Sequence, residues 1–445
     1  MQKSLAGAAL SGKKSNFAVP RAPRPDRMKV AVINKSDSTG GAAVVSHRLT
    51  SALRDKGVDA RMLVVERGQA DEWVESYASP LADKAAFLAE RAQIFACNHF
   101  SRRNLFKADS GRWGRDVTAI PWVREADVVM LNWINQGGMS LKSVDKLCSL
   151  GKPVIWTMHD MWNCTGVCHY SFDCLSYTGQ CGRCKYLNSR KPSDLSRRTQ
   201  MAKAKLYSRH NNITFVAVSN WLARCCREST LMADAPLEVI HNAFPIEKFS
   251  FGRQEAGDIA AARGKKVIVS GAARLDVEVK GFEYIIETSR HIARHMPDLA
   301  KKIHIVLYGA IRDRELIDAI AVDHTYLGKL DGMAAINNVY TQADIVLSTA
   351  LYENLPGTLI EGQASGCLPV TFGAGGQDDI VDHLSTGYIA DYRSPQSVAE
   401  GIEWALGAGV SREALHESVR RKFSADAIAD QYIDLCERML AKCNK

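Results

Sequence analysis

The sequence predicts an α/β protein made of two doubly wound domains that face each other across a cleft. Short apolar runs rich in Val and Ile alternate with segments of helical period, and this alternation stops and restarts once along the chain. A chain of 445 residues is also too long for one ordinary hydrophobic core. Ligands of doubly wound sheets bind beyond the carboxyl ends of the strands, so two facing domains would share one binding site.

The first series of elements occupies residues 28–245. Its strands are apolar along their whole length, as expected where helices cover both faces of a parallel sheet. Strands are predicted at residues 29–34, 60–65, 127–132, 153–158 and 214–218, and helices at residues 42–56, 81–99 and 139–150. Residues 1–27 precede this domain, and their interleaved prolines and arginines predict a disordered basic arm.

The second series occupies residues 246–423 and begins in a polar link rich in Gly and Ala at residues 245–264. Strands are predicted at residues 266–271, 303–308, 344–349 and 368–372, and helices at residues 282–295, 331–341 and 357–365. Helical periodicity resumes in residues 424–445, and we expect this last helix to pack across both domains.

Composition excludes several classes of protein. No stretch approaches the roughly 18 consecutive apolar residues of a transmembrane helix, and the apolar run at residues 5–10 is too short for a signal peptide. We therefore expect a cytoplasmic protein whose 12 cysteines are reduced or bound to metal. The 57 basic residues exceed the 49 acidic ones and form no stripe or tail, which disfavours nucleic acid and favours phosphates, nucleotides or a lipid headgroup surface as partners.

The most informative segment is residues 352–364, where Glu353 and Glu361 bracket seven residues. Glu353 belongs to a loop after a predicted strand, and Glu361 belongs to the helix that follows. Carboxylates hold sugar hydroxyls through charge-assisted hydrogen bonds, and the helix that begins near Gly357 directs free N–H groups at an anion in front of it. Two acids at this spacing are commonplace on their own, so the interpretation depends on their surroundings.

The surroundings of this segment carry a resemblance to a known family. Ala-Asp-Ile-Val-Leu-Ser at residues 343–348 precedes it, and Gly-Cys-Leu-Pro-Val at residues 366–370 and Gly-Ala-Gly-Gly at residues 373–376 follow it. In these features the sequence resembles family 4 of the retaining glycosyltransferases, whose E-x7-E motif has similar surroundings. The resemblance covers nearly all of residues 28–445 and implies the GT-B fold, in which two Rossmann-like domains face each other across a cleft.

The same resemblance implies how a donor diphosphate would be held. Gly-Ala-Ala-Arg at residues 271–274 and Lys-Gly-Phe at residues 280–282 are similar to stretches in which an arginine and a lysine grip the diphosphate, here Arg274 and Lys280. Two fixed cations and a helix N-terminus neutralise the charge of the leaving group, so no metal cofactor is required for catalysis. The insert at residues 276–279 departs from the common family pattern, which leaves the shape of this loop open.

The first domain supplies further candidate residues. Gly40 and Gly41 follow the first predicted strand and open a helix, which is a weak signal alone, but in the similar family this loop lies at the cleft near the donor phosphates and the acceptor. His159 follows another strand, and the histidine at this position in the family faces the donor sugar. A lone histidine is more often structural. Asp160 either orients His159 or caps the next helix.

The resemblance also implies the remaining roles. Glu353 would bind hydroxyls of the donor sugar, with Asn354 and Leu355 beside it at the donor, Glu361 would bind the ribose, and His159 the sugar near its 6-position. The reaction would be a front-face displacement that retains anomeric configuration, with a nucleotide-diphosphate sugar as donor and a glycan or lipid-linked acceptor in bacterial surface polysaccharide assembly.

Two other classes of protein share the expected fold. A sugar-nucleotide epimerase would use the same grip on the nucleotide, and a non-catalytic sugar-nucleotide-binding subunit would use the cysteine-rich loop to dock a partner. The presence of both glutamates, the arginine and the lysine argues against the non-catalytic subunit.

Five of the twelve cysteines fall between Cys164 and Cys184. Cys181 and Cys184 have the spacing of a zinc knuckle, and Cys168 and Cys174 would complete four thiolates around a structural zinc. The segment resembles that of the colanic-acid-type subgroup of family 4. The alternatives are reduced cysteines or a redox-labile pair, and a catalytic zinc is disfavoured because four thiolates leave no open position.

A basic stretch follows the cysteines, with arginines and lysines between residues 190 and 205. We interpret it as one solvated helix face. The alternative is contact with anionic lipid headgroups near a lipid-linked acceptor, which would make the protein peripheral on the inner face of the membrane.

Overall fold

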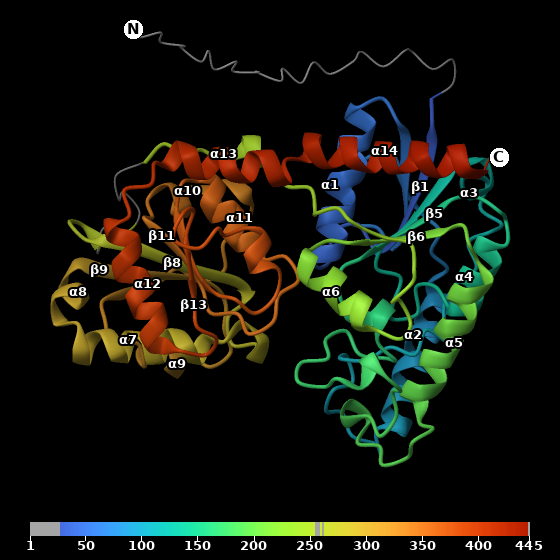
Figure 1. The fold of residues 1–445 in the computed structure, drawn as a ribbon, viewed down its shortest axis with the longest axis horizontal. Coiled ribbons are helices and arrows are strands. Elements are labelled where there is room, and N and C mark those ends of the chain that lie inside the picture. Colours follow the sequence, from blue (N-terminus) through green and yellow to red (C-terminus); the bar gives the residue numbers. More distant parts are fainter. Residues whose placement is uncertain (1–26, 254–258, 260–261, 444–445) are drawn as a thin grey trace, which may run out of the picture.

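The computed structural model describes residues 27–253, 259 and 262–443, and it contains two parallel sheets, one in each half of the chain (Figure 1). The predicted α/β architecture of two Rossmann-like domains is therefore confirmed. Apart from Arg27, the basic arm predicted for residues 1–27 lies outside the described residues, as do residues 254–258, 260 and 261 of the predicted link.

The first sheet has seven strands in the order β3-β2-β1-β4-β5-β6-β7. The strands are β1 (Lys29–Ser36), β2 (Asp59–Glu66), β3 (Val74–Ser76), β4 (Val128–Leu131), β5 (Val154–Met158), β6 (Ile213–Ala217) and β7 (Leu237–Val239). Its helices are α1 (Gly41–Asp55), α2 (Pro80–Cys97), α3 (Pro121–Glu125), α4 (Leu141–Cys148), α5 (Leu195–Arg209) and α6 (Asn220–Glu228). The central strands β4 and β5 are completely buried, which explains their continuous apolar composition.

The second sheet has six strands in the order β10-β9-β8-β11-β12-β13. The strands are β8 (Lys266–Arg274), β9 (Ile303–Ala310), β10 (His324–Tyr326), β11 (Ile345–Ser348), β12 (Leu368–Phe372) and β13 (Tyr388–Ala390). The helices are α7 (Phe282–His295), α8 (Pro297–Lys302), α9 (Glu315–Asp318), α10 (Met333–Thr341), α11 (Gly357–Ala364), α12 (Pro395–Gly407), α13 (Arg412–Phe423) and α14 (Ala425–Cys443).

Every strand predicted from the sequence is present, and the four that the sequence did not predict share one property. The missed strands β3, β7, β10 and β13 have three residues each and lie at the edges of the two sheets. A three-residue edge strand is too short to show a hydrophobic period, and it is not buried on both faces. The central strands, which position the cleft, were predicted correctly.

The chain passes between the domains near residues 244 and 424, and these two crossings lie side by side. Phe244 N donates to the carbonyl oxygen of Phe423 at 2.9 Å, and Ala425 N donates to the carbonyl oxygen of Phe244 at 3.0 Å. Helix α13 packs on α11 of the second domain, whereas α14 packs on α1 of the first. The hydroxyl of the buried Tyr432 in α14 lies 3.0 Å from Thr157 Oγ1. The two consecutive helices together therefore run across both domains (Figure 1).

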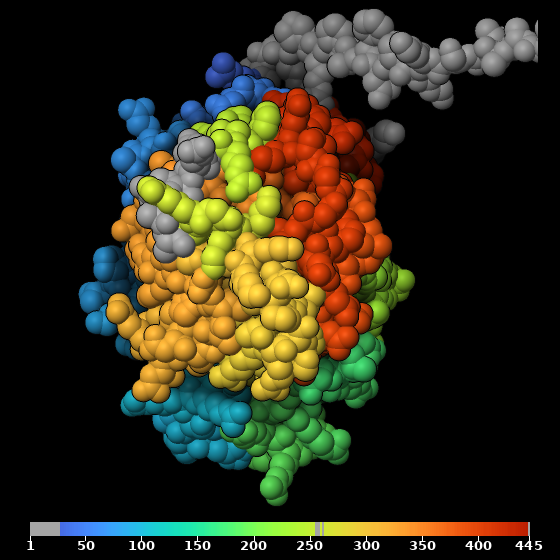
Figure 2. All heavy atoms as spheres, turned by 90° about the vertical axis from the view of Figure 1, so that its left-hand side faces the viewer, coloured from blue at the N-terminus to red at the C-terminus, as the bar shows by residue number. Residues whose placement is uncertain are grey.

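The cysteine-rich segment, residues 164–184, is irregular. It lies between β5 and α5, and the connection contains three short 3-10 helices: η1 (Met161–Cys164), η2 (Ser176–Thr178) and η3 (Lys185–Leu187). Seen from the side of the second domain, the green and teal part of the first domain that includes this segment extends past the second domain (Figure 2).

Candidate active site at the interdomain cleft

A cavity of about 870 Å³, here called the cleft cavity, lies between the domains beyond the carboxyl ends of strands from both sheets. Its first-domain wall includes Lys35, Gly40, Gly41, Arg48, Trp133 and His159, and its second-domain wall includes Ala273, Glu353, Asn354, Leu355, Gly357 and Glu361. The fold thus brings seven of the site residues named from the sequence to one space. They are Gly40, Gly41, His159, Glu353, Asn354, Leu355 and Glu361.

The turn between β1 and α1 forms one wall of the cleft cavity. Gly40 has φ +90°, a left-handed conformation that favours glycine, and nothing lies within 4 Å of the place where a Cβ would be. The backbone conformation, and not a lack of space, therefore accounts for this glycine. Gly41 begins α1, whose N-terminus has no side-chain cap, so free N–H groups at the cavity favour an anion there.

His159 follows β5 and lines the cleft cavity. Its Nε2 lies 3.0 Å from Oδ1 of Asn132, which follows the neighbouring strand β4. Burial lowers the pKa of His159 to about 4, although the Asp160 carboxylate acts in the opposite direction. The imidazole is therefore neutral at neutral pH, and its second ring nitrogen can form a hydrogen bond with a hydroxyl group.

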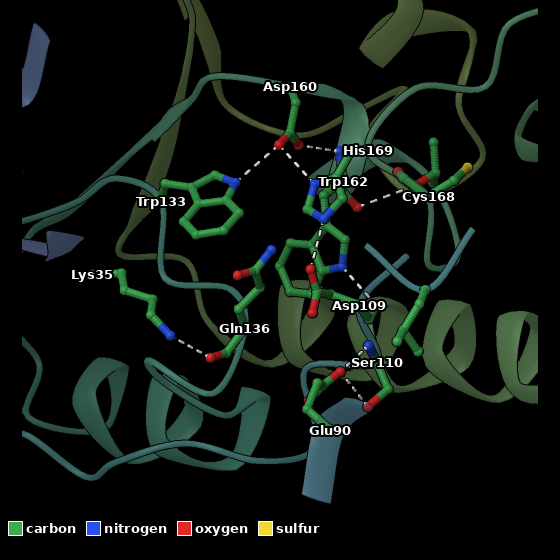
Figure 3. Close-up of polar contacts among 12 residues, drawn as sticks. Lys35, Glu90, Asp109, Ser110, Trp133, Gln136, Asp160, Trp162, Cys168 and His169 are labelled. Carbon is green, nitrogen blue, oxygen red and sulfur yellow. Dashed lines mark hydrogen bonds and ion pairs between the residues drawn. The ribbon is translucent and has the colours of Figure 1, made fainter. Parts of the chain in front are cut away.

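The hydrogen bonds of Asp160 go to the next turn and to the side chains of Trp133 and His169 (Figure 3). Its Oδ1 accepts from Trp162 N at 2.8 Å, which caps η1, and its Oδ2 accepts from Trp133 Nε1 at 3.0 Å. Of the two roles expected for Asp160, the structure therefore shows capping. The contact with Trp133 also fixes an indole that lines the cavity.

A second histidine, His169, is held between two carboxylates (Figure 3). Its Nδ1 lies 2.7 Å from Asp160 Oδ2, and its Nε2 lies 2.6 Å from Asp109 Oδ2. Burial alone would lower the pKa of His169, but the two carboxylates outweigh burial and raise it to about 10. Asp109 also forms an ion pair with Arg91. This charged network lies beside Trp133, whose ring centroid is 5.9 Å from that of His169. No spacing or motif in the sequence indicated it.

Glu353 and Lys280 meet at the second-domain wall. Glu353 follows β11, and Lys280 ends the 3-10 turn η6 (Glu278–Lys280) after the neighbouring strand β8. The Lys280 ammonium forms an ion pair with Glu353 Oε1, and both side chains stay partly accessible, at 35% and 18%. They also line a small second recess together with Gly271. A positive and a negative group are therefore available to the same ligand.

Arg274, the last residue of β8, points to a different partner. Its Nε donates to Asp276 Oδ1 at 2.6 Å, and Asp276 belongs to the insert that departs from the family pattern. Its neighbour Ala273, rather than Arg274, lines the cleft cavity. The structure thus joins Lys280 to Glu353 and pairs Arg274 with the insert, so the two cations do not converge in this conformation.

Asn354 and Leu355 connect the motif to its surroundings. Asn354 Nδ2 donates to the carbonyl oxygen of His159 at 3.0 Å, and its Oδ1 accepts from Ser219 Oγ at 2.6 Å. Both partners belong to the first domain, so Asn354 ties the two walls together. Leu355 is 9% exposed and packs in the core of the second domain at the edge of the cavity.

Glu361, on α11, faces α1 of the first domain. Its Oε1 lies 4.0 Å from Nη2 of Arg48. Burial raises the pKa of Glu361 to about 7, and Arg48 opposes that shift. Arg48 was not predicted from the sequence. Helical spacing could have identified it, because Arg48 lies seven residues after Gly41 on the face of α1 that lines the cavity.

The predicted zinc site is not supported. Cys168, Cys174, Cys181 and Cys184 line one cavity of about 250 Å³. Within residues 27–253, 259 and 262–443, however, no group of three or more His, Cys, Asp or Glu side chains is arranged to hold a metal ion. All four cysteines are free thiols. They therefore gather around a common space without forming a ligand set.

A buried lysine lies beside these cysteines. The Lys203 ammonium, on α5, donates to the carbonyl oxygens of Trp162, Thr165 and Gly166, the last two at 3.2 Å, and lies 3.5 Å from the Trp162 ring centroid. Burial lowers the pKa of Lys203 to about 7. The basic stretch is therefore not one solvated face as predicted, because Lys203 points inward while Lys205 is exposed. The ammonium holds the start of the irregular segment together.

Two models of known protein families together match most of the chain. The model of "Glycosyl transferases group 1" matches residues 253–422, and that of "Glycosyltransferase Family 4" matches residues 39–248. Over 260 residues the chain is 24% identical to WcaC of Escherichia coli, a protein named for glycosyl transfer in colanic acid biosynthesis. This alignment covers 56% of the chain and 59% of WcaC. The chain spans about half the length of the curated relatives it matches.

Solved structures share the fold. HepE of Anabaena in complex with UDP and glucose has a TM-score of 0.59 at 16% identity, covering 92% of this chain and all of that one. Sucrose-phosphate synthase of Thermosynechococcus elongatus has a TM-score of 0.64 at 15% identity, covering 94% of this chain and all of that one. No helix in the part of the chain that the structure describes is both long and apolar enough to span a membrane.

Proposed function

The chain belongs to the family 4, group 1 glycosyltransferases, and from this premise we propose that it is a retaining enzyme with a nucleotide-diphosphate sugar as donor. The acceptor is a glycan or a lipid-linked glycan. The observation that carries the proposal is the arrangement of charges at the cleft cavity, where Lys280 pairs with Glu353 and Arg48 faces Glu361. The UDP complexes of HepE, a protein of the same fold, support the choice of donor.

The cations and helix ends would bind the donor diphosphate. Lys280 is accessible beside the cavity, and the uncapped N-terminus of α1 adds N–H groups. Arg274 would join them by leaving Asp276, a rotation that its partly exposed side chain permits. These fixed positive groups stabilise the charge that develops on the departing diphosphate.

The carboxylates and His159 would orient the sugar and the ribose. Glu353 accepts hydrogen bonds from sugar hydroxyls, and Asn354 fixes its loop against the first domain. Glu361, whose pKa of about 7 lets it donate or accept, binds the ribose hydroxyls. Neutral His159 binds a further sugar hydroxyl across the cleft.

The reaction proceeds as a front-face displacement. The bond from the anomeric carbon to the diphosphate oxygen breaks while the acceptor oxygen forms its new bond on the same face. The acceptor proton passes to the departing diphosphate, so no protein base is required and configuration is retained. Lys280 favours this step because it stabilises the leaving group.

We place the enzyme in the cytoplasm, in the assembly of bacterial surface or secreted polysaccharide. The relation to WcaC supports this context. If the acceptor is lipid-linked, the exposed residues Arg190, Lys191 and Arg198 would bring the first domain to the inner face of the membrane.

A donor screen tests the proposed function. The purified protein is incubated with a panel of sugar nucleotides, and the products are identified by mass spectrometry. Slow release of a nucleoside diphosphate from one donor is expected of a transferase without its acceptor. Interconversion of sugars without release would make the protein an epimerase, and binding without turnover would make it a non-catalytic subunit.

A further inference from the structure

A second large cavity lies between the cysteine-rich segment and the loops of the second domain. It measures about 830 Å³ and is lined by Phe172 and Arg224 from the first domain and by Tyr352, Gly375 and Arg393 from the second. We call it the segment cavity. Its size is within the range of about 300–1,000 Å³ that is typical of small-molecule sites.

The segment cavity adjoins the proposed reaction site. Tyr352 lines the segment cavity, and the next residue, Glu353, lines the cleft cavity. The backbone carbonyl of Glu353 accepts from Gly376 N at 3.0 Å, directly beside Gly375. Within the lining of the segment cavity, the Tyr352 hydroxyl donates to the carbonyl oxygen of Phe172 at 2.8 Å. A long ligand in the segment cavity would thus end next to the donor sugar.

Basic side chains outnumber acidic ones in the segment cavity. Lys107 pairs with Glu278 at 3.4 Å, and Lys185 pairs with Asp173. Three lining arginines form no ion pair with a described carboxylate. They are Arg103, Arg224 and Arg393. Unpaired guanidinium groups around a cavity favour a ligand with carboxylate or phosphate groups, which they hold in a bidentate manner.

Aromatic rings line the same space. The Tyr352 ring lies 4.7 Å from that of Phe172 and 5.6 Å from that of Trp221, measured between centroids. Tyr392 also lines the cavity, with Arg393 5.0 Å from its ring centroid. The rings offer flat apolar surface beside the cations, which suits a sugar ring because its C–H face is apolar and its edges are polar.

The backbone around the segment cavity is strained where it presents these groups. Phe172 and Arg393 have φ +49° and +62°, a left-handed conformation that is unfavourable for large side chains. Asn104 and Asn188, also in the lining, share this conformation, which asparagine tolerates. Strain of this kind is found preferentially at ligand-binding sites.

We propose that the segment cavity binds the acceptor, and that the acceptor is an acidic saccharide carrying uronate or phosphate groups. The inference rests on the proposed function, because it assigns the second substrate of the same reaction. Arg103, Arg224 and Arg393 bind the acidic groups, and the rings of Tyr352 and Trp221 stack on the sugar. The acceptor is then selected by side chains from both domains, with Phe172 of the cysteine-rich segment in the same lining.

Calorimetric binding to the full chain tests this site without requiring turnover. The probes are a hyaluronan tetrasaccharide, which carries carboxylates, glucose 1-phosphate, which carries phosphate, and cellotetraose, which is neutral. Each titration is done with and without saturating UDP. We expect the tetrasaccharide or glucose 1-phosphate to bind in the presence of UDP, and cellotetraose to bind at least about tenfold more weakly. The acidic probe that binds identifies the acidic group.

Two variants and a matched control locate the binding. Arg224→Gln and Arg393→Gln are each expected to weaken binding of the acidic probe about tenfold, and Arg294→Gln, an exposed arginine on α7 outside the cavity, should bind like the wild type. If an arginine variant unfolds, the salt dependence of binding to the wild-type protein is the test instead. The affinity for the acidic probe should fall as the salt concentration rises, whereas the affinity for cellotetraose should not change.

Three results would overturn the inference: displacement of the probe by UDP, wild-type affinity in both arginine variants, or equal binding of the neutral probe. If no sugar nucleotide is turned over in the donor screen but the acidic probe still binds, the proposed function is wrong and the acidic-saccharide site stands.

Discussion

The loop from Tyr352 to Pro356 and the cysteine-rich segment are both irregular, and both lie beside groups that can carry charge, but these groups are used in opposite ways. At the loop, Lys280 and Glu353 pair at the edge of a large cavity and stay partly accessible. Near the cysteines, Lys203 is completely buried and bound to backbone carbonyls. Charges that reach a cavity are available to a ligand, whereas the enclosed Lys203 is taken up by backbone carbonyls and is not.

The largest effect is expected at the accessible charges. Lys280→Ala should slow release of nucleoside diphosphate from the donor by about 100- to 1,000-fold, because it removes a positive group that stabilises the leaving diphosphate. The rate is measured at saturating donor concentration. Lys329→Ala is the matched control, since Lys329 is an exposed lysine of the same domain that pairs with Asp331. Comparable rates for the two variants would place the chemistry elsewhere.

The enclosed charge should affect stability instead. Lys203→Met keeps the length of the side chain but leaves the carbonyls of Trp162, Thr165 and Gly166 without their donor, so we expect the free energy of unfolding to fall by about 3 kcal/mol. Urea denaturation measures this change. Lys205→Met, two residues along the same helix and exposed, should change it by about 0.5 kcal/mol or less. Equal losses in both variants would mean that the buried ammonium does not organise the segment.

The same contrast explains what could be predicted from the sequence. The central strands and the loop at Glu353 were predicted because parallel strands are apolar throughout and because the residues before and after the motif are specific to a family. The Asp109–His169–Asp160 network could not be predicted, since it joins residues 60 positions apart in the chain. The cysteine spacing suggested zinc because spacing reports which sulfurs can meet, but not whether they are arranged as a ligand set, and within the described residues they are not.

The His169 network is expected to show its effect as a pH dependence. The pKa of His169 is raised from 6.5 to about 10, so its charge stabilises the folded state fully below about pH 6.5, and this contribution is lost as the pH rises through 10. The difference in unfolding free energy between wild type and His169→Asn should therefore shrink over that interval. Lys203 titrates in the same interval in both proteins, so its effect cancels in the difference. A difference that stays constant from pH 6 to pH 10.5 would show that His169 is not held as a cation.

The smallest effect is expected from metal removal. Treatment with a chelator should leave the melting temperature unchanged, because the cysteines of the segment form no ligand set for a metal ion within the described residues. Metal analysis of the untreated protein is the accompanying measurement. A drop in melting temperature on chelation, with zinc present at one ion per chain, would reverse the contrast between the two regions. The cysteine-rich segment would then be held by a metal ion. In that case Lys203→Met should lower the free energy of unfolding by much less than about 3 kcal/mol, because the zinc–thiolate bonds would keep the segment folded without the lysine.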